Sequence, residues 1–381
     1  GDGNLNLVFI VEGASGSLVV KQALPYARVV GESWPMSLDR AFFEYEASRR
    51  LGGRDPGRLP LLHYFDREQA LQIMEHLHPH IILRRGLIAG TRFPHLGGHL
   101  GRYLARTLFR GSDWSMETAH RKADVALFAG NAELCGITEN LFFTDPFHDC
   151  PRNAHNPALA REVAAIRADR DLKLAALRMK SRFCTVAQSL LHGDLHTGSV
   201  MVSADDSRVI DAEFATYGPM GFDIGSLLAN IWMAAFAQAG LRSDPAAAHA
   251  YRRWILDLAE SIWRVLVEEF THLWRTERTG ILGGWELFDG PGDGTGPDLA
   301  LAALLDEIWT DALGFAGIEI HRRILGLAHA AELEAIVDAD RRADCERRAL
   351  RFGRALAVEP VRFSHVGEVS ALAADIEACA R

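Results

Sequence analysis

Three carboxylates between residues 194 and 213 have types and spacing that suit the transfer of a phosphoryl group. Asp194 lies in a polar loop after a short apolar run, and Asp211 and Glu213 follow the next predicted strands. Phosphoryl transfer requires one carboxylate that orients the attacking hydroxyl, and metal ions that neutralise phosphate charge. Asp194 suits the first role. Asp211 and Glu213 are two residues apart, so at a strand end they would point the same way and share one Mg²⁺.

Two other interpretations of this segment stay open. His192, Asp194 and His196 form an H-x-D-x-H string that could bind a transition metal. Such a site needs further His or Glu ligands, which the sequence does not obviously supply. Alternatively, the acids are turn residues and His192 is a buried histidine that supports the loop by packing and hydrogen bonding. For His192 alone we favour this structural interpretation.

The amino-terminal residues contain two features that could contact phosphates. The turn at residues 1–4, which includes Gly3 and Asn4, could bring backbone N–H groups close to phosphate oxygens. Lys21 lies near the end of the second predicted strand. Either feature alone is weak evidence, because a glycine turn is usually a simple hairpin and a strand lysine is usually solvated.

Lys21 would need a carboxylate partner to hold it against phosphates, as protein kinases pair a strand lysine with a helix glutamate. Glu44, two turns into the next predicted helix, could provide it, and Glu46 is the competing partner. The apolar neighbours Phe43 and Ala47 slightly favour Glu44, but the phase of the helix does not separate the two glutamates.

Asp223 opens a strongly apolar predicted helix, and we interpret it as the N-cap of that helix. In kinase-like folds the acid at this place also accepts hydrogen bonds from the backbone of the catalytic loop. We therefore expect a structural role for Asp223 and do not count it as catalytic.

The elements that must position these residues divide into a strand-rich first part and a helical remainder. One helix is predicted among the first strands, with Ser37 as N-cap and Gly52-Gly53 as its end. From His95 onward the apolar periodicity is helical, and residues 289–297 have the composition of a surface loop or flexible linker. The strands are predicted over residues 5–11, 17–22, 61–65, 71–74, 200–202 and 208–210.

This order predicts an α+β, bilobal fold, and the family resemblance given below implies that it is protein-kinase-like. Its amino-terminal, ATP-binding lobe, residues 1–77, would be small and rich in β-strands with one helix, and its carboxy-terminal lobe, residues 78–381, would be large and mainly helical. The turn at residues 1–4 normally joins two strands, so we expect that a strand precedes Gly1.

The overall composition is that of an ordinary globular protein whose 381 residues exceed what a single core usually supports. A formal net charge of −9 leaves no basic stripe for nucleic acid, so no nucleic-acid partner is expected. The five cysteines are scattered and odd in number, which suggests neither a disulfide framework nor a zinc site. No apolar stretch long enough to span a membrane is found, and we expect a cytoplasmic protein without a membrane partner.

With these residues in place, the chain resembles the 5-methylthioribose kinase family, a branch of the kinase-like fold related to aminoglycoside and choline kinases. The resemblance runs nearly from end to end, and jointly the matching segments are very specific. They are GDGNLN at residues 1–6, KQALPY at 21–26, GESWP at 31–35, HGDLHTGS at 192–199 and YGPMGFDIG at 217–225. Residues 80–88 and 322–329 resemble plant-type members in particular.

The resemblance implies an ATP- and Mg²⁺-dependent kinase of methionine salvage that phosphorylates the 1-hydroxyl of 5-methylthioribose, a small sugar, and could form a homodimer. Asp194 would orient that hydroxyl, the loop with Trp34 would close over the sugar, and Arg322 and Arg323 would complete its pocket. Asp211 and Glu213 would hold the metal. The ATP site would comprise Gly3, Asn4, Lys21, Glu44, Glu75, His76, Leu77, Asp211, Ala212 and Glu213.

Two positions depart from familiar patterns. Related kinases have an asparagine metal ligand where this chain has Ser199, and Glu213 offers a compensating carboxylate. Ala212 replaces the proline usual in this family's Asp-x-Glu element, which loosens the loop. The competing hypotheses are a kinase of another small alcohol, such as choline or an aminoglycoside, and a pseudokinase that binds nucleotide without turnover.

Overall fold

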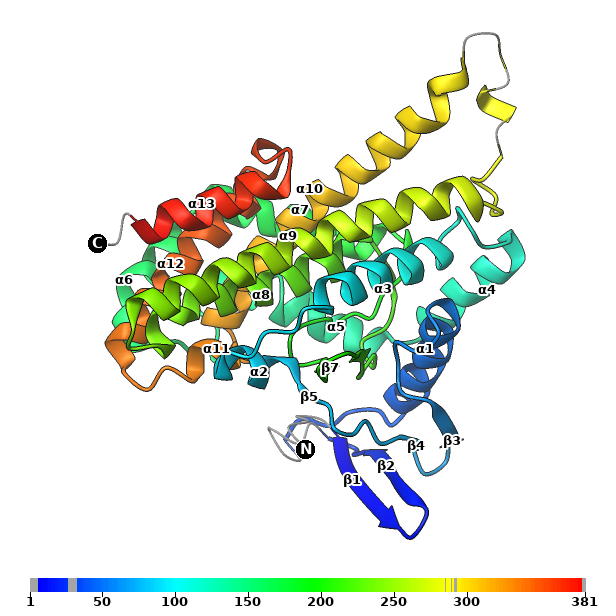
Figure 1. Cartoon of the computed structure of the whole chain (residues 1–381), viewed down its shortest axis with the longest axis horizontal. Coiled ribbons are helices and arrows are strands. Elements are labelled where there is room, and N and C mark those ends of the chain that lie inside the picture. Colours follow the sequence, from blue (N-terminus) through cyan, green and yellow to red (C-terminus); the bar gives the residue numbers. More distant parts are fainter. Residues whose placement is uncertain (1–5, 27–32, 285, 289, 291–292, 379–381) are drawn as a thin grey trace.

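The structure is a computed structural model that describes residues 6–26, 33–284, 286–288, 290 and 293–378. An antiparallel sheet with strand order β1-β2-β4-β3 forms a small lobe together with helix α1, and Figure 1 shows this lobe below the helices. The bounds are β1 Asn6–Gly13, β2 Gly16–Ala23, α1 Arg40–Arg54, β3 Leu62–Asp66 and β4 Leu71–Glu75. The predicted hairpin and the two later strands are therefore confirmed within one or two residues.

Helix α1 begins and ends later than predicted. The Ser37 hydroxyl accepts a hydrogen bond from the backbone N–H of Asp39, which forms a turn before the helix, so Ser37 is not the N-cap. Gly52 and Gly53 lie inside the helix, which ends at Arg54. A helical glycine costs only about 1 kcal/mol relative to alanine, and the buried inner face of α1 offsets that cost.

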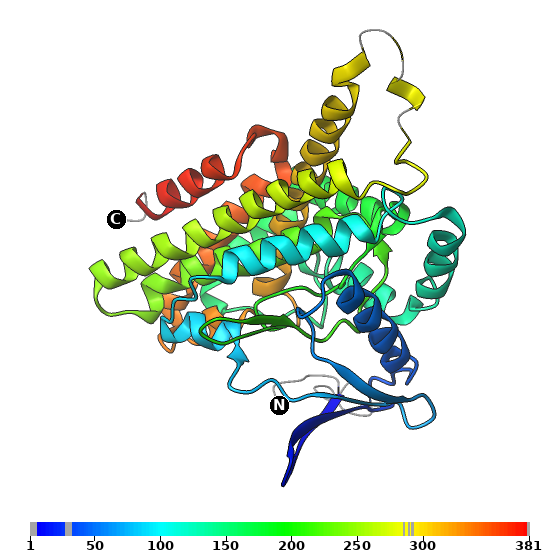
Figure 2. The same cartoon turned by 45° about the vertical axis from the view of Figure 1, so that its right-hand side comes forward.

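The remainder of the described chain, which we call the large lobe, consists mainly of helices. Helix α8 lies at its centre against α9, α10 and α12, and α3 runs alongside α9 (Figures 1 and 2). The bounds are α2 Leu83–Ala89, α3 Leu96–Arg110, α4 Thr118–Phe128, α5 Ala132–Leu141, α6 Ala160–Ala168, α7 Arg170–Thr185, α8 Gly221–Leu241, α9 Pro245–Thr276, α10 Gly296–Leu325, α11 Ala331–Glu334, α12 Ala339–Val358 and α13 Val366–Ala378.

Within the described residues, α8 alone is long and apolar enough to cross a membrane by length and composition. Of its apolar window, 83% is buried inside the fold, so α8 is a core helix. Its residues are buried on every side of the helix, as expected for a helix enclosed by other helices.

Two small sheets carry the segment that contains the three carboxylates. One has the order β5-β7-β8 and the other pairs β6 with β9. The bounds are β5 Ile81–Ile82, β6 Ser189–Leu190, β7 Val200–Val202, β8 Ser207–Val209 and β9 Tyr217–Gly218. Strand β8 ends at Val209, so the prediction that Asp211 and Glu213 occupy a strand end with period-two geometry is wrong. Asp211 instead has a positive φ of 75°, which turns the chain sharply after the strand.

Candidate active site

Asp194 lies between β6 and β7 and is held by a pair of arginines from α10. Terminal nitrogens of Arg322 and Arg323 donate to its Oδ1 at 3.0 and 3.1 Å, and His196 Nε2 lies 3.3 Å from its Oδ2. Burial by itself would raise the pKa of Asp194, but His196 and the two guanidinium groups lower it well below its ordinary value. The carboxylate therefore stays ionised, firmly oriented and weakly basic.

Glu319 fixes the two arginines, and sequence reasoning missed it. Its Oε1 accepts from Arg323 Nε at 2.7 Å and from Asn230 Nδ2 at 3.0 Å, and its Oε2 accepts from Arg322 Nε at 2.9 Å. Glu319 is completely buried. The signal was its position three and four residues before the arginines on one helix, the spacing at which side chains meet.

The catalytic loop is held by backbone hydrogen bonds to Asp223. One oxygen of this buried carboxylate accepts from the N–H of His192 at 2.6 Å and the other from the N–H of Gly193 at 3.0 Å. This contact was expected, but the N-cap interpretation is wrong, because α8 begins at Gly221 and Asp223 lies within its first turn. Gly193 has φ of +86°, and a Cβ there would lie 2.1 Å from the carbonyl oxygen of Phe214, so only glycine fits.

Two histidines support the loop as neutral hydrogen-bonding groups. His192 is buried, and its Nε2 bonds the carbonyl oxygen of Ile210 at 2.8 Å, as the structural interpretation predicted. His196 Nδ1 accepts from the N–H of Gly198 at 2.8 Å, which leaves the proton on the Nε2 that faces Asp194. This arrangement disfavours the transition-metal interpretation, because the ring nitrogens are already used inside the loop.

Ser199 has a structural contact in place of the metal-ligating asparagine of related kinases. Its hydroxyl accepts from the N–H of His196 at 2.8 Å and lies 3.1 Å from the carbonyl oxygen of Asp194. The side chain therefore closes the loop on itself. The metal-ligating role that the asparagine has in related kinases would then fall to the carboxylates after β8.

Lys21 brings the small lobe into contact with those carboxylates. Its Nζ donates to Glu44 Oε1 at 2.7 Å and also contacts Asp211 Oδ1. Burial opposes its charge, but Asp211, Glu44 and Glu213 together raise the pKa of Lys21. Glu46 pairs with Arg49 and Arg50 on the outer part of α1, so the structure selects Glu44 as the partner of Lys21.

Glu213 is enclosed by polar groups that the sequence did not indicate. Asn6 Nδ2 donates to its Oε2 at 2.9 Å, and Arg40 Nε lies 3.6 Å from the same oxygen. Its own carbonyl oxygen accepts from Asn131 Nδ2 at 2.9 Å. Burial, followed by the nearby charge of Asp211, raises the pKa of Glu213 to about 8.

These two carboxylates fit a hard divalent cation. Burial, followed by repulsion from Asp211, holds the pKa of Glu213 above neutrality, and Lys21 stands against the more exposed Asp211. Carboxylate oxygens are the ligands that Mg²⁺ prefers. Asp211 and Glu213 could therefore hold Mg²⁺, which would neutralise phosphate charge when bound.

The other predicted site residues lie around this centre or outside the described chain. Glu75 ends β4, His76 Nδ1 lies 2.7 Å from the Ser17 hydroxyl, and Leu77 is buried. Trp34 packs beside Met36 in a small apolar cluster that also contains Leu134, Ile137 and Phe214. Ala212, which stands between Asp211 and Glu213 in the sequence, is buried. Gly3 and Asn4 lie outside the described residues.

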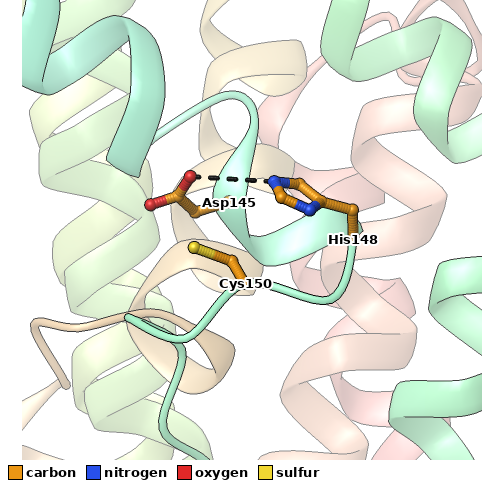
Figure 3. Close-up of side chains that lie close together, drawn as sticks. All are labelled: Asp145, His148 and Cys150. Atoms are coloured by element: carbon orange, nitrogen blue, oxygen red, sulfur yellow. Dashed lines mark ion pairs between the residues drawn. The ribbon is translucent and has the colours of Figure 1, made fainter.

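A separate group, Asp145, His148 and Cys150, has ligand atoms close enough for a metal ion (Figure 3). Arg152 already donates to both oxygens of Asp145, at 2.8 and 2.9 Å. His148 Nε2 lies 3.8 Å from Asp145. The carboxylate therefore has its cationic partner, and we assign no metal to this group.

Comparisons with known proteins agree with this geometry. The model of the phosphotransferase enzyme family matches residues 1–258. Methylthioribose kinase 1 of Oryza sativa subsp. japonica is 43% identical over 97% of this chain and 86% of its own length. The methylthioribose kinases of Escherichia coli O45:K1 and Geobacillus kaustophilus are 43% and 41% identical, over 97% and 99% of this chain and 88% and 90% of their own lengths. Among solved structures, a glucosamine kinase in crystal form B is a distant match, with 15% identity and a TM-score of 0.48 over 95% of this chain and 82% of that one.

The chain is thus a phosphotransferase of the kinase-like α+β fold. Within that class, it belongs to the methylthioribose kinase family.

Proposed function

We propose that this protein transfers the γ-phosphoryl group of ATP to the 1-hydroxyl of 5-methylthioribose, a step of methionine salvage. The proposal is carried by one observation, the pair of arginines that both bind Asp194 in a chain similar along nearly its whole length to methylthioribose kinases. A sugar hydroxyl placed at Asp194 would meet one acceptor and two donors, which is the complement that a polyol requires.

Asp194 acts mainly by orientation in this mechanism. Its pKa is held well below the ordinary value, so it is a poor acceptor of a proton from an unactivated hydroxyl. The transition state of phosphoryl transfer is loose, and the attacking hydroxyl needs positioning more than prior deprotonation. Asp194 accepts the hydroxyl hydrogen bond, aims the oxygen at the phosphorus, and receives the proton as the new bond forms.

The small lobe holds the nucleotide. Lys21, oriented by Glu44, contacts the phosphates. The assignment of Gly3 and Asn4 to the ATP site belongs to the same proposal. Main-chain groups of residues 75–77 receive the adenine. The division into an ATP-binding lobe of residues 1–77 and a sugar-binding lobe of residues 78–381 belongs to the same proposal.

The sugar side involves the loop with Trp34 and the arginine pair. Trp34 packs against α5 through Leu134 and lies beside Phe214, which directly follows Glu213. Closure of this loop over the sugar excludes water from the phosphoryl group. Arg322 and Arg323 offer N–H donors to a neutral polyol. A cationic acceptor calls for a site of net negative charge, whereas here Glu319 and Asp194 only balance the two guanidinium groups.

That electrostatic argument disfavours choline and aminoglycosides as acceptors. The pseudokinase alternative is disfavoured by the presence of Lys21, Asp194, Asp211 and Glu213 in one connected centre. A cytoplasmic location and a homodimer remain predictions of the same hypothesis.

A coupled assay of ADP release with Mg-ATP tests the proposal. The acceptor panel is 5-methylthioribose, ribose, choline and kanamycin. Turnover confined to 5-methylthioribose is expected. Turnover on another alcohol would keep the phosphotransferase and replace the acceptor, and ATP binding without turnover on any acceptor would favour the pseudokinase.

A further inference from the structure

A second polar cavity lies between the α8–α9 turn, α12 and α13. It has a volume of about 220 Å³, and none of the candidate active-site residues lines it. Four arginines line it, Arg242 and Arg252 from the turn and α9, and Arg341 and Arg348 from α12. We call this cavity the arginine pocket.

Positive charge in the arginine pocket is far from balanced. Glu377 of α13 is the one carboxylate among the lining residues, and its Oε2 lies 2.8 Å from both Arg252 and Arg348. Two carboxylates nearby in sequence are engaged elsewhere, since Asp244 caps α9 and Asp344 pairs with Arg347 at 2.7 Å. The Arg242 guanidinium is held by Gln238 and Tyr251, which do not line the cavity. Arg252, Arg341 and Arg348 therefore share one carboxylate, in a chain whose overall net charge is −9.

The remaining partners of these arginines are neutral groups that orient the guanidinium without cancelling its charge. Arg341 donates to the carbonyl oxygens of Ala239 and Arg242 at 3.0 and 3.3 Å. Arg348 Nε donates to the carbonyl oxygen of Asp344 at 2.9 Å. Arg242 stacks over the ring of Tyr251 at 4.5 Å, and burial lowers its pKa, as expected of a cation without a carboxylate partner.

The start of α9 adds to the positive potential. Ser243, Pro245 and Ala248 line the same cavity, so the first turn of a 32-residue helix borders it. The N-terminal end of a helix carries a partial positive charge that favours anions. This contribution is secondary to the guanidinium groups of Arg252, Arg341 and Arg348, which provide the directed donors.

We propose that the arginine pocket is an anion-binding site for a phosphate group, either free or as a small phosphate monoester. Preoriented guanidinium groups match phosphate oxygens with paired N–H donors. A cavity of about 220 Å³ is smaller than the roughly 300–1,000 Å³ usual for drug-sized ligands, which favours a small anion. The negative charge of the phosphate would balance the arginine charge that Glu377 alone does not balance.

Isothermal titration with inorganic phosphate tests the site. The titration is run on the full chain with a non-hydrolysable Mg-ATP analogue at saturation, so that the phosphate positions of the catalytic centre are filled, and at constant ionic strength against chloride. Saturable binding is expected for the unaltered protein. Arg341→Gln keeps a donor for the two carbonyl oxygens and should weaken phosphate binding at least about tenfold, the scale of a lost charge-assisted pair.

Two further variants make the result decisive. Ser243→Glu places a carboxylate at an exposed lining position and leaves every arginine in place, so it should abolish phosphate binding even if Arg341→Gln is poorly folded. Arg264→Gln, at an exposed position of α9, is the matched control and should bind as the unaltered protein does. The proposal is overturned if no saturable binding is found, or if all four proteins bind phosphate equally.

Discussion

The side chain of Asn6 donates a hydrogen bond of 2.9 Å to Glu213, across 207 positions of sequence. Asn6 opens β1 of the small lobe, and Glu213 belongs to the candidate metal site of the large lobe. Arg40 of α1 donates to Asn6 Oδ1 at 3.1 Å, so the start of α1 joins the same contact. The two lobes therefore meet directly at the carboxylate proposed to bind Mg²⁺.

Asn6→Ala should weaken the binding of Mg²⁺ at the proposed metal site. A buried hydrogen bond contributes about 1 kcal/mol, so the Mg²⁺ concentration for half-maximal rate should rise roughly five- to tenfold. The measurement is a Mg²⁺ titration of ADP release. Asn140→Ala, which removes only an exposed bond within α5, is the control, and an unchanged Mg²⁺ curve for Asn6→Ala would contradict the contact's role.

Glu44→Gln and Glu46→Gln should behave differently although the residues are two positions apart. Without the Glu44 charge, Lys21 keeps only its contact with Asp211 and is no longer held against the phosphates. The KM for ATP should therefore rise about tenfold, which is equivalent to about 1.4 kcal/mol. Glu46→Gln loses only surface pairs with Arg49 and Arg50 and should leave the KM for ATP unchanged. Equal effects of the two variants on ATP kinetics would refute the assignment.

Asp194→Asn should retain ATP binding and lower kcat by about 10²–10⁴-fold, the usual scale for a positioned acid-base group. Because the pKa of Asp194 is lowered, the unaltered enzyme should keep this carboxylate ionised throughout the mildly acidic range. The pH profile of kcat for the unaltered enzyme should therefore show no decline near pH 4–5 that is caused by protonation of Asp194. The profile of Asp194→Asn should have the same shape in this range. Near-normal kcat in Asp194→Asn would remove the residue from the reaction.

Arg323→Ala should raise the KM for the sugar far more than the KM for ATP. A hydrogen bond to a charged group contributes about 1.5–3 kcal/mol, which corresponds to roughly 10–150-fold in the sugar kcat/KM. Glu319→Gln, which keeps both arginines but loosens them, should shift the same parameter less. Arg351→Ala, at an exposed position of α12, is the control. An effect confined to ATP would exclude the arginine pair from the sugar pocket.

His321 predicts an acid-sensitive fold. Burial lowers its pKa to about 4 from an ordinary 6.5, while Nδ1 bonds the carbonyl oxygen of Gly317 at 2.7 Å. Between these values the unfolded chain binds a proton that the folded chain does not, so stability falls as pH drops through this window. The loss approaches about 3 kcal/mol at the acid end and is absent above pH 6.5.

The measurement is the unfolding midpoint against pH from 4 to 7. His321→Gln should flatten this dependence by about one proton, and the exposed His120→Gln should not alter it. Identical slopes for the unaltered protein and His321→Gln would show that this histidine is not the titrating group.

Local sequence was sufficient to determine the elements and the chemistry that they carry. Alternating and helical periodicities predicted the first hairpin and the helical remainder, because each reflects the burial of one face of a single element. Asp194, in a loop, and Lys21, on a strand, were singled out because residue type and position limit what they can do. The boundaries of α1 and the end of β8 were misplaced, since tertiary burial outweighed the glycine and strand signals.

Contacts between distant segments were decided only by the tertiary structure. The sequence favours Glu44 over Glu46 only slightly, and the rotation of α1 against the sheet selected Glu44. Asn6 became a partner of Glu213 only when β1 met the loop after β8. Each of these choices depends on which charged group loses its water, and that is a property of the packed chain, in which buried charges must be paired.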